Sequence, residues 1–336
     1  MFMKNKVIIA LTISIFLVVL FYIGVCMLSS QDDIKPDRAS GRLCYLPILK
    51  TPGEVELLPG LRFKIDTGSD LSTITISDLA LLDSLGFKVQ KKIYPVVGRD
   101  GGGKINVAFT RYRVDLPLIN YDIEIDSSGK KYGVGSLKNA NLLHNVDFVE
   151  SKSGMSVLGI DFLEKFKLEY DFTDRAIALY LSEPDTAYVT CAELYASKAP
   201  LAMPMLGKRY SLDMKVAGYE GRFFIDSGIK DARVKMPANQ ANIVHSSELT
   251  EDTLESALGK FPAKVYGKAL VSIGDRVGLG NVYFYDSMEE DYAISPFNLF
   301  LQNVLIDFPE KKVKLFPLYR KDKTIPELVT KIELRD

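Results

Sequence analysis

The longest apolar stretch of the chain lies close to its first residue. Residues Val7–Leu28 contain no charged side chain, and a helix of that length spans the ~30 Å hydrocarbon core of a membrane. Lys4 and Lys6 precede the stretch, and Asp32 and Asp33 follow it. Because positive charge is retained on the cytoplasmic side, we expect a single-pass membrane protein with its N-terminus in the cytoplasm and its body in the periplasm or outside the cell.

A cleaved signal peptide and a lipoprotein anchored through Cys26 are the two alternatives to this anchor. A signal peptide has an apolar region of only ~7–15 residues that ends in a small-x-small cleavage site. The stretch here is longer, and no clear site of that kind follows it. Val25 is bulky where a lipoprotein carries a small residue. We therefore predict an uncleaved signal-anchor helix.

Beyond residue 42 the apolar runs are short, and several alternate with polar side chains as half-buried β-strands do. Glycine, proline and aspartate separate them. The runs lie at 44–49, 61–65, 104–116 and 121–125 in the first half of the chain, and at 209–216, 221–225, 268–273 and 282–286 in the second. This pattern predicts a mostly β protein.

Few helices are expected, and all of them are short. Residues 77–85 start with a serine cap and are followed by Gly86. Residues 250–258 start with a threonine cap, carry two acids in the first turn and are followed by Gly259. Leu158–Phe166 is expected to include a third short helix.

The chain also repeats itself. Phe63–Ser69 reads FKIDTGS and Phe223–Ile229 reads FFIDSGI, so each is an apolar strand that runs into Asp-Thr/Ser-Gly. Val157–Tyr180 aligns without gaps on Ala293–Phe316. Each half therefore begins and ends with related elements in the same order, which predicts two similar lobes.

The repeat and the apolar stretch together divide the chain. The predicted parts are a membrane anchor (1–30), a tether (31–42), a first lobe (43–182), an interlobe linker (183–199), a second lobe (200–320) and a C-terminal tail (321–336).

At these motifs the chain resembles the aspartic peptidases, both the two-lobed pepsin-like type and the half-sized retropepsin type. The resemblance rests on Ile65–Ser69 and Ile225–Gly228. Val157–Gly159 supports it, since an apolar-apolar-Gly element follows the catalytic loop in this family, and Ile160–Leu163 looks retropepsin-like. The resemblance covers roughly residues 43–318 and implies a two-lobed aspartic-protease β-barrel fold that arose by internal duplication.

The resemblance implies that Asp66 and Asp226 are the catalytic residues, one from each lobe. Two carboxylates held ~3 Å apart cannot both ionise easily, so they share a proton, as is documented for aspartic proteases. One oxygen takes a proton from the attacking water, and the protonated partner donates a hydrogen bond to the developing oxyanion. The expected activity is that of an aspartic endopeptidase, which needs no cofactor and no metal.

The residues that follow the two aspartates are expected to support them. Gly68 and Gly228 let the backbone turn tightly beside the carboxylates and present amide donors to them. The resemblance further implies that the hydroxyls of Thr67 and Ser227 bond across the lobe interface. Ser69 would hydrogen-bond its neighbouring carboxylate.

Two positions depart from the family pattern. Ile229 stands where serine or threonine is usual, and Ser295 stands where the first half has Gly159. With Ile229 in place of a hydroxyl residue, Asp226 would lack one hydrogen-bond donor, which could shift the pKa values of the two aspartates or weaken the site. One alternative is therefore a catalytically impaired peptide-binding or scaffold module on the same fold. Another is an exported structural β protein, in which the carboxylates would lie more than ~6 Å apart.

A glycine-rich segment between two strand-like runs is the candidate flap. It contains Gly98, Gly101, Gly102 and Gly103. In the family, a mobile hairpin after the first catalytic loop closes over the substrate, and glycine permits both bending and close approach to a peptide. A simple hairpin turn is the alternative. A polypeptide substrate is expected to bind beneath the flap as an extended strand.

The composition of the chain argues against two further classes of function, nucleic-acid binding and zinc catalysis. The 336 residues include 42 Lys+Arg and 43 Asp+Glu, for a formal net charge of −1, and nucleic-acid binders usually show a strong basic excess. Two histidines and three cysteines at no recognisable spacing argue against a zinc enzyme. Cys44 and Cys191 could form a disulfide in an exported protein, but two free thiols are the expectation. Since one chain supplies both aspartates, the catalytic unit is expected to be a monomer.

Overall fold

The structure is a computed structural model of the 336-residue chain. It describes residues 13–18, 34–50, 53–99, 105–184, 188–197, 209–229, 233–256, 259–285, 292–295, 303–316 and 328–335.

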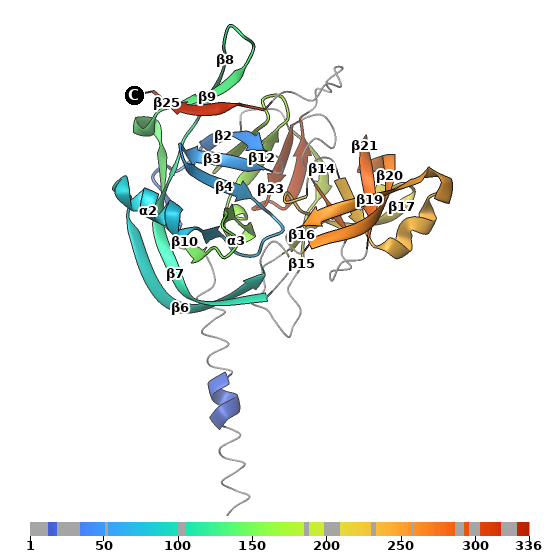
Figure 1. Ribbon diagram of the computed structural model, residues 1–336, viewed down its shortest axis with the longest axis horizontal. Helices are drawn as coiled ribbons and strands as arrows, with labels where there is room; N and C mark the ends of the chain where they lie inside the picture. The colour runs from blue at the N-terminus through green and yellow to red at the C-terminus, as the bar shows by residue number, and fades with distance from the viewer. Residues whose placement is uncertain are drawn as a thin grey trace, which may run out of the picture.

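The described residues are mostly β-strand, which confirms the predicted class (Figure 1). The strands of the first half are β1 (Lys35–Pro36), β2 (Arg42–Lys50), β3 (Glu54–Leu58), β4 (Leu61–Ile65), β5 (Thr73–Ile74), β6 (Val89–Arg99), β7 (Ile105–Leu118), β8 (Asp122–Ile125), β9 (Lys131–Gly135), β10 (Asn141–Glu150), β11 (Ser156–Leu158), β12 (Lys167–Asp171) and β13 (Ala176–Tyr180). Those of the second half are β14 (Val189–Glu193), β15 (Tyr195–Ser197), β16 (Arg209–Val216), β17 (Tyr219–Ile225), β18 (Arg233–Met236), β19 (Leu249–Ser256), β20 (Gly259–Ile273), β21 (Arg276–Phe284), β22 (Ala293–Ile294), β23 (Val304–Asp307), β24 (Lys312–Leu315) and β25 (Lys331–Leu334).

These strands form three sheets. A 14-stranded sheet has the order β14-β24-β23-β12-β13-β2-β3-β4-β11-β5-β10-β7-β6, with β1 paired to β10. An 8-stranded sheet has the order β15-β16-β17-β22-β18-β21-β20-β19, and a 3-stranded sheet has the order β25-β9-β8. Figure 1 shows the blue and green strands of the first half on one side and the orange strands of the second half on the other.

The two halves pair their strands in the same order around the two Asp-Thr/Ser-Gly motifs. β11 lies parallel to β4, and Leu158 is paired with Ile65. In the second half β22 lies parallel to β17, and Ile294 is paired with Ile225. Each of the two short strands also has an antiparallel neighbour, β5 for β11 and β18 for β22. The repeat seen in the sequence therefore corresponds to a repeat of strand pairing.

The matching end elements of the halves join them into one sheet. β12 and β13 form one hairpin, and β23 and β24 form the other. The two hairpins turn alike, since Arg175 and Lys311 both have positive φ, 54° and 56°. β12 then pairs antiparallel with β23, with Lys167 opposite Asp307. The 14-stranded sheet thus crosses from one half of the chain to the other.

Two of the three predicted helices are present. Helix α2 spans Ile76–Ser84, and its cap is Thr75, which accepts from the Asp78 N–H at 3.1 Å, rather than the predicted serine. Helix α3 spans Ile160–Leu163. The described residues also contain three 3-10 helices, η1 (Leu137–Asn139), η2 (Ala238–Ile243) and η3 (Ser246–Glu248).

The helix predicted for residues 250–258 is wrong. Leu249–Ser256 forms strand β19, which pairs antiparallel with β20 from Leu249↔Tyr266 to Ser256↔Gly259. The threonine cap and the two acids are local helix signals, and the paired strand outweighs them because it satisfies the backbone along the whole segment.

Segments expected as a tether, a linker and a tail also carry strands. β1 lies in the predicted tether and pairs with β10, and β14 and β15 lie in the predicted linker and pair with β24 and β16. β25 lies in the predicted tail and pairs parallel with β9 of the first half. The sequences of these segments are short and polar, so they gave no strand signal. They form strands because each pairs with a strand that would otherwise leave backbone groups unpaired.

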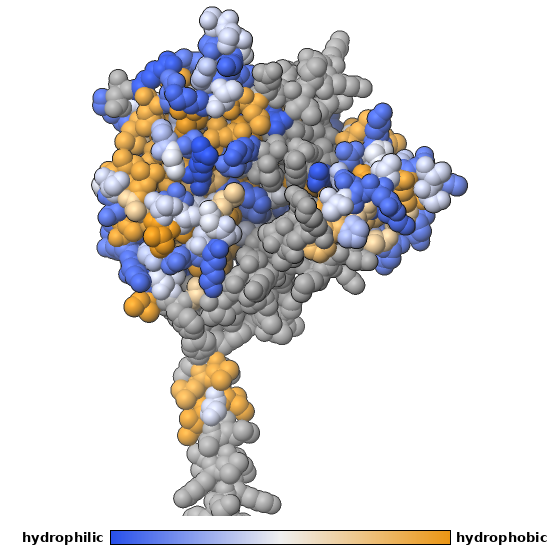
Figure 2. Space-filling model, viewed as in Figure 1, coloured by the Kyte–Doolittle hydropathy of each residue, from blue (hydrophilic) through white to orange (hydrophobic). Residues whose placement is uncertain are grey.

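The predicted membrane anchor falls largely outside the described residues. Residues 13–18 are helical, and their apolar side chains are mostly exposed, from 54% for Ile13 to 67% for Val18. They form an orange, hydrophobic band in Figure 2. No helix within the described ranges is long and apolar enough to cross a membrane. The anchor therefore stays a prediction.

Candidate active site

Each of the two predicted aspartates follows a buried strand. β4 and β17 both end in a buried isoleucine immediately before the aspartate. The Asp66 N–H donates to the Leu158 carbonyl at 3.0 Å, and the Asp226 N–H donates to the Ile294 carbonyl at 2.9 Å. The backbone of each motif is therefore fixed by the short parallel strand beside it.

Thr67 and Ser227 hold the two motifs together across the halves. The Thr67 N–H donates to Ser227 Oγ, and the Ser227 N–H donates to Thr67 Oγ1, both at 3.0 Å. Each hydroxyl in turn donates to a carbonyl of the opposite strand, Thr67 to Ile225 at 2.8 Å and Ser227 to Ile65 at 2.9 Å. Both side chains are buried, so each donates one bond and accepts one away from water.

The two glycines lie against the carboxylates. The Gly68 N–H donates to Asp66 Oδ1 at 3.0 Å, and the Gly228 N–H donates to Asp226 Oδ1 at 2.8 Å. A Cβ placed on Gly228 would lie 2.8 Å from Asp66 Oδ1 and 2.9 Å from Asp226 Oδ1. Because both oxygens are this close to one point, they are less than about 6 Å apart. The structure thus brings Asp66 and Asp226 together.

Gly228→Ala is expected to disable this site. Real Cβ atoms do not approach oxygens this closely, and both neighbours are carboxylates rather than flexible side-chain ends. Displacing them by about 1 Å is expected to lower any activity of the pair by about 100-fold. Gly267→Ala is the control, since a Cβ there meets only Asn281 Oδ1, at 3.9 Å. Equal effects of the two substitutions on peptide cleavage would contradict the packing described here.

Ser69 makes a different hydrogen bond from the one expected. Its hydroxyl donates to the Leu71 carbonyl at 3.0 Å, so its single proton is not directed to Asp66. Ile229 forms the same backbone turn as Ser69, because both N–H groups donate to the carbonyl of their own aspartate at 3.2 Å. Ile229 therefore removes no hydroxyl bond that Ser69 supplies to the other carboxylate.

The second departure from the family pattern has a steric explanation. A Cβ on Gly159 would lie 2.7 Å from the Leu71 carbonyl carbon and 2.8 Å from the Ser69 oxygen. Glycine is therefore required at that point of the first half. Ser295 is fully buried, and its N–H donates to the Arg233 carbonyl at 3.1 Å, so the second half accommodates a side chain there.

A lysine that the sequence did not single out lies beside the pair. The Nζ atom of Lys64 is 3.1 Å from Asp66 Oδ2. Burial acts to lower the pKa of Lys64, but the charges of Asp66 and Asp226 outweigh it and raise that pKa above its usual value. The sequence did contain a sign of this contact. Lys64 precedes Asp66 by two residues at the end of a predicted strand, and this spacing places both side chains on one face.

The proton affinity of Asp226 is raised. Burial among protein atoms and the neighbouring Asp66 charge raise the pKa of Asp226 to about 7, against the opposing pull of Lys64, the Gly228 N–H and Lys235. Asp226 nevertheless keeps part of its surface open, whereas the side chain of Asp66 is 4% exposed. A carboxyl group that stays protonated at mildly acidic pH can act as a proton donor.

The candidate flap lies in a long hairpin. β6 and β7 pair antiparallel from Val89↔Val114 to Arg99↔Ile105, and Gly98 is opposite Asn106 near the end of the hairpin. The other three predicted flap residues, Gly101, Gly102 and Gly103, lie outside the described residues. The second half has a corresponding hairpin in β19 and β20.

Cys44 and Cys191, the two cysteines among the described residues, are free. Cys44 is buried in β2, and the thiol of Cys191 donates to the Val313 carbonyl at 3.3 Å. Burial raises the pKa of both thiols to about 12. Neither thiol is therefore ionised near neutral pH, and neither is a candidate nucleophile.

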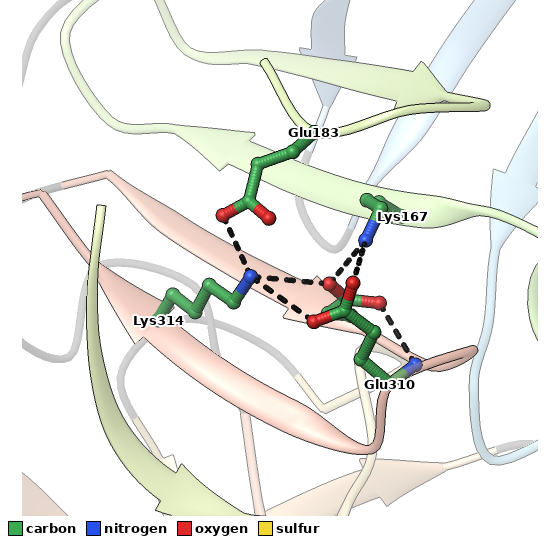
Figure 3. Close-up of polar contacts among 5 residues, drawn as sticks. Lys167, Glu183, Glu310 and Lys314 are labelled. Atoms are coloured by element: carbon green, nitrogen blue, oxygen red, sulfur yellow. Dashed lines mark hydrogen bonds and ion pairs between the residues drawn. The ribbon is translucent and has the colours of Figure 1, made fainter. Parts of the chain in front are cut away.

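A group of acids where the two halves meet is close enough to hold a metal ion. It consists of Glu183, Asp307 and Glu310. Two lysines already balance it (Figure 3): Lys167 Nζ lies 2.5 Å from Asp307 Oδ2, and Lys314 Nζ lies 2.6 Å from Glu183 Oε1 and 3.3 Å from Asp307 Oδ2. The charge distribution fits an ion-pair network better than a metal centre.

Comparison with known proteins adds no family to this picture. No family model matches the chain, and no curated protein matches it in sequence.

Proposed function

We propose that the chain is an aspartic endopeptidase with a two-lobed, pepsin- or retropepsin-like fold, and that it hydrolyses peptide bonds of exported or membrane-associated polypeptides. The observation that carries the proposal is the approach of the Asp66 and Asp226 carboxylates to within contact of Gly228. The hydrogen bonds between Thr67 and Ser227 support it, because they hold the carboxylates of two chain segments in one place.

The chemistry follows from one proton shared by two carboxyl groups. A water bound between them loses a proton to the ionised group as its oxygen attacks the peptide carbonyl. The protonated group donates to the carbonyl oxygen, where negative charge develops. Asp226 is partly open to the outside, and its raised pKa leaves it protonated below about pH 7. Cleavage is therefore expected at neutral to mildly acidic pH.

The long hairpins support an extended polypeptide as the substrate. Within the described part of the chain, β6 pairs with β7 and with no other strand, so it is an edge strand of this sheet. The backbone groups of such an edge are available to pair with an added strand. A membrane anchor, as predicted from Val7–Leu28, would restrict the substrates to proteins on the same side of the membrane.

The decisive test is cleavage of a broad peptide library by residues 31–336 between pH 4 and pH 8. Mass spectrometry would identify new peptide ends, and Asp66→Asn would be measured in parallel as a variant of nearly identical shape. We expect cleavage by the wild type and none above background by the variant. Equal cleavage by both proteins, or no cleavage by either at any pH, would overturn the proposal.

A further inference from the structure

The two strand-and-loop repeats are Phe63–Ser69 and Phe223–Ile229. The first contains two charged residues, Lys64 and Asp66, and of these only Lys64 has no charged counterpart in the second. The repeats align so that Lys64 corresponds to Phe224. Phe224 lies beneath the Arg209 guanidinium, whose carbon is 5.1 Å from the ring centre. Two residues before the aspartate, therefore, the first repeat carries an ammonium and the second carries an aromatic ring.

The Lys64 ammonium is directed at one carboxylate. Its side chain is 25% exposed, and Nζ lies 3.1 Å from Oδ2 of Asp66, which is almost fully buried. The other oxygen of Asp66 accepts the Gly68 N–H. Each Asp66 oxygen thus faces one donor, Lys64 Nζ or the Gly68 N–H, whereas the bond found at Asp226 is from the Gly228 N–H to Oδ1.

Other charged and titratable groups also lie around the pair. Lys235 on β18 acts on Asp226 through its charge, and the buried Tyr170 hydroxyl on β12 lies near Ser227. On β3, Glu54 is opposite Lys64 in the strand register and lies 4.0 Å from the Arg62 guanidinium. Of these groups, Lys64 has the ion pair with Asp66.

We propose that Lys64 divides the roles of the two aspartates: its ion pair keeps Asp66 as the carboxylate that receives the proton of water, and the shared proton rests on Asp226. This inference rests on the proposed peptidase function and adds an assignment that the carboxylate pair alone does not give. Lys64 acts through Asp66 and is a positioning residue.

The assigned steps balance. Asp66 takes one proton from water while the water oxygen bonds to the carbonyl carbon, and Asp226 gives its proton to the carbonyl oxygen. The resulting diol collapses when its C–N bond breaks. Asp66 then passes its proton to the leaving nitrogen, and a hydroxyl of the diol returns a proton to Asp226. The products are a carboxylic acid and an amine, and the pair regains its starting protonation.

The electrostatic surroundings agree with this assignment. The pKa of Asp226 is raised to about 7 by burial and by the Asp66 charge, and Lys64 partly opposes that rise. The pKa of Lys64 is itself raised, so the lysine stays charged throughout the range in which Asp226 titrates. Removing the ammonium should therefore move the titration of the pair toward higher pH.

Lys64→Met tests this in the pH dependence of kcat/KM for a cleaved peptide. We expect both limbs of the profile to move up by about 1 pH unit, the lower end of the effect of an opposite charge within 4–6 Å. Lys64→Gln, a second neutral variant, should give the same shift, and Lys64→Arg should restore the wild-type profile. Arg62→Met is the control, because it removes a 54% exposed charge from the same strand and should leave the profile unchanged.

A direct titration separates this inference from the proposed function. Carbon-13 NMR of labelled aspartate follows the Asp226 carboxyl without any substrate, and its midpoint should rise by the same amount in Lys64→Met and Lys64→Gln. Cleavage with an unshifted profile and an unshifted midpoint would overturn the role of Lys64 alone. No cleavage by the wild type would overturn the peptidase proposal and, with it, the assigned steps, even if the midpoint moves.

Discussion

Asp226→Asn is expected to abolish peptide cleavage and, at neutral and alkaline pH, to make the folded protein more stable. The first effect follows from losing the proposed proton donor, and general acid–base catalysis contributes about 10²–10⁴-fold in rate. The second effect follows because ionised Asp226, buried and next to the charge of Asp66, lowers the free energy of unfolding, and asparagine carries no charge. Asparagine has the same shape and can still accept the Gly228 N–H.

The sign of the stability effect depends on pH. The folded-state pKa of Asp226 is about 7, above the value of about 3.9 of an unfolded chain. Between these values the folded protein holds the proton more tightly, so wild-type stability falls as pH rises through this window. The asparagine of the variant has no proton to lose. The stability advantage of Asp226→Asn should therefore grow from none near pH 3 to on the order of 2–4 kcal/mol at pH 8.

Urea unfolding at several pH values, together with cleavage assays, would measure both effects. Asp213→Asn is the matched control. It removes a carboxylate from the exposed surface of β16, where Arg222 lowers the pKa of Asp213 through a hydrogen bond. That variant should cleave like the wild type and lose stability slightly. If Asp226→Asn is inactive but less stable than the wild type at pH 8, ionised Asp226 does not destabilise the folded protein as described.

Asp307→Asn is expected to destabilise the protein by about 3–5 kcal/mol, the range for removing one member of a buried ion pair. The Asp307 side chain is fully buried, and the ammonium groups of Lys167 and Lys314 approach it from neighbouring strands (Figure 3). Asparagine would keep the bond from the Glu310 N–H to Oδ1. Of the partners found among the described residues, the two largely buried lysines would keep the half-exposed Glu183 and Glu310.

Urea unfolding measures this loss, with Glu310→Gln as the matched control. The Glu310 side chain is 49% exposed, and exposed ion pairs contribute only about 0–1 kcal/mol. Equal losses for the two variants would show that the ion pairs do not depend on burial as described. Because β12 and β23 belong to different halves, Asp307→Asn should also weaken the pairing between the halves.

The sequence predicted best what depends on local pattern. Alternating runs gave the strands, and the repeated motif identified Thr67 and Ser227, whose bonds across the halves need only that the two loops meet. The failed helix at residues 250–258 shows the limit of local signals. Its cap and first-turn acids are visible in the sequence, but the pairing with β20 is decided by a partner strand.

The chemistry of single side chains was harder to predict. Ser69 was assigned a bond to its carboxylate because of its position in the motif, yet its rotamer directs the proton to the Leu71 carbonyl. Lys64 is plainly visible in the sequence, but its meaning depends on a distance of 3.1 Å to Asp66 that no residue pattern states. Such details depend on packing in three dimensions.

The path of the chain through its sheets also has a consequence for biosynthesis. β23 and β24, from residues 304–315, lie between β12 and β14 in the largest sheet, and β25, from residues 331–334, pairs with β9. Domains usually fold in order as they leave the ribosome. Here edge strands of the first half pair with residues that are made much later, so a polypeptide terminated before residue 304 would expose unpaired strands to aggregation and proteolysis.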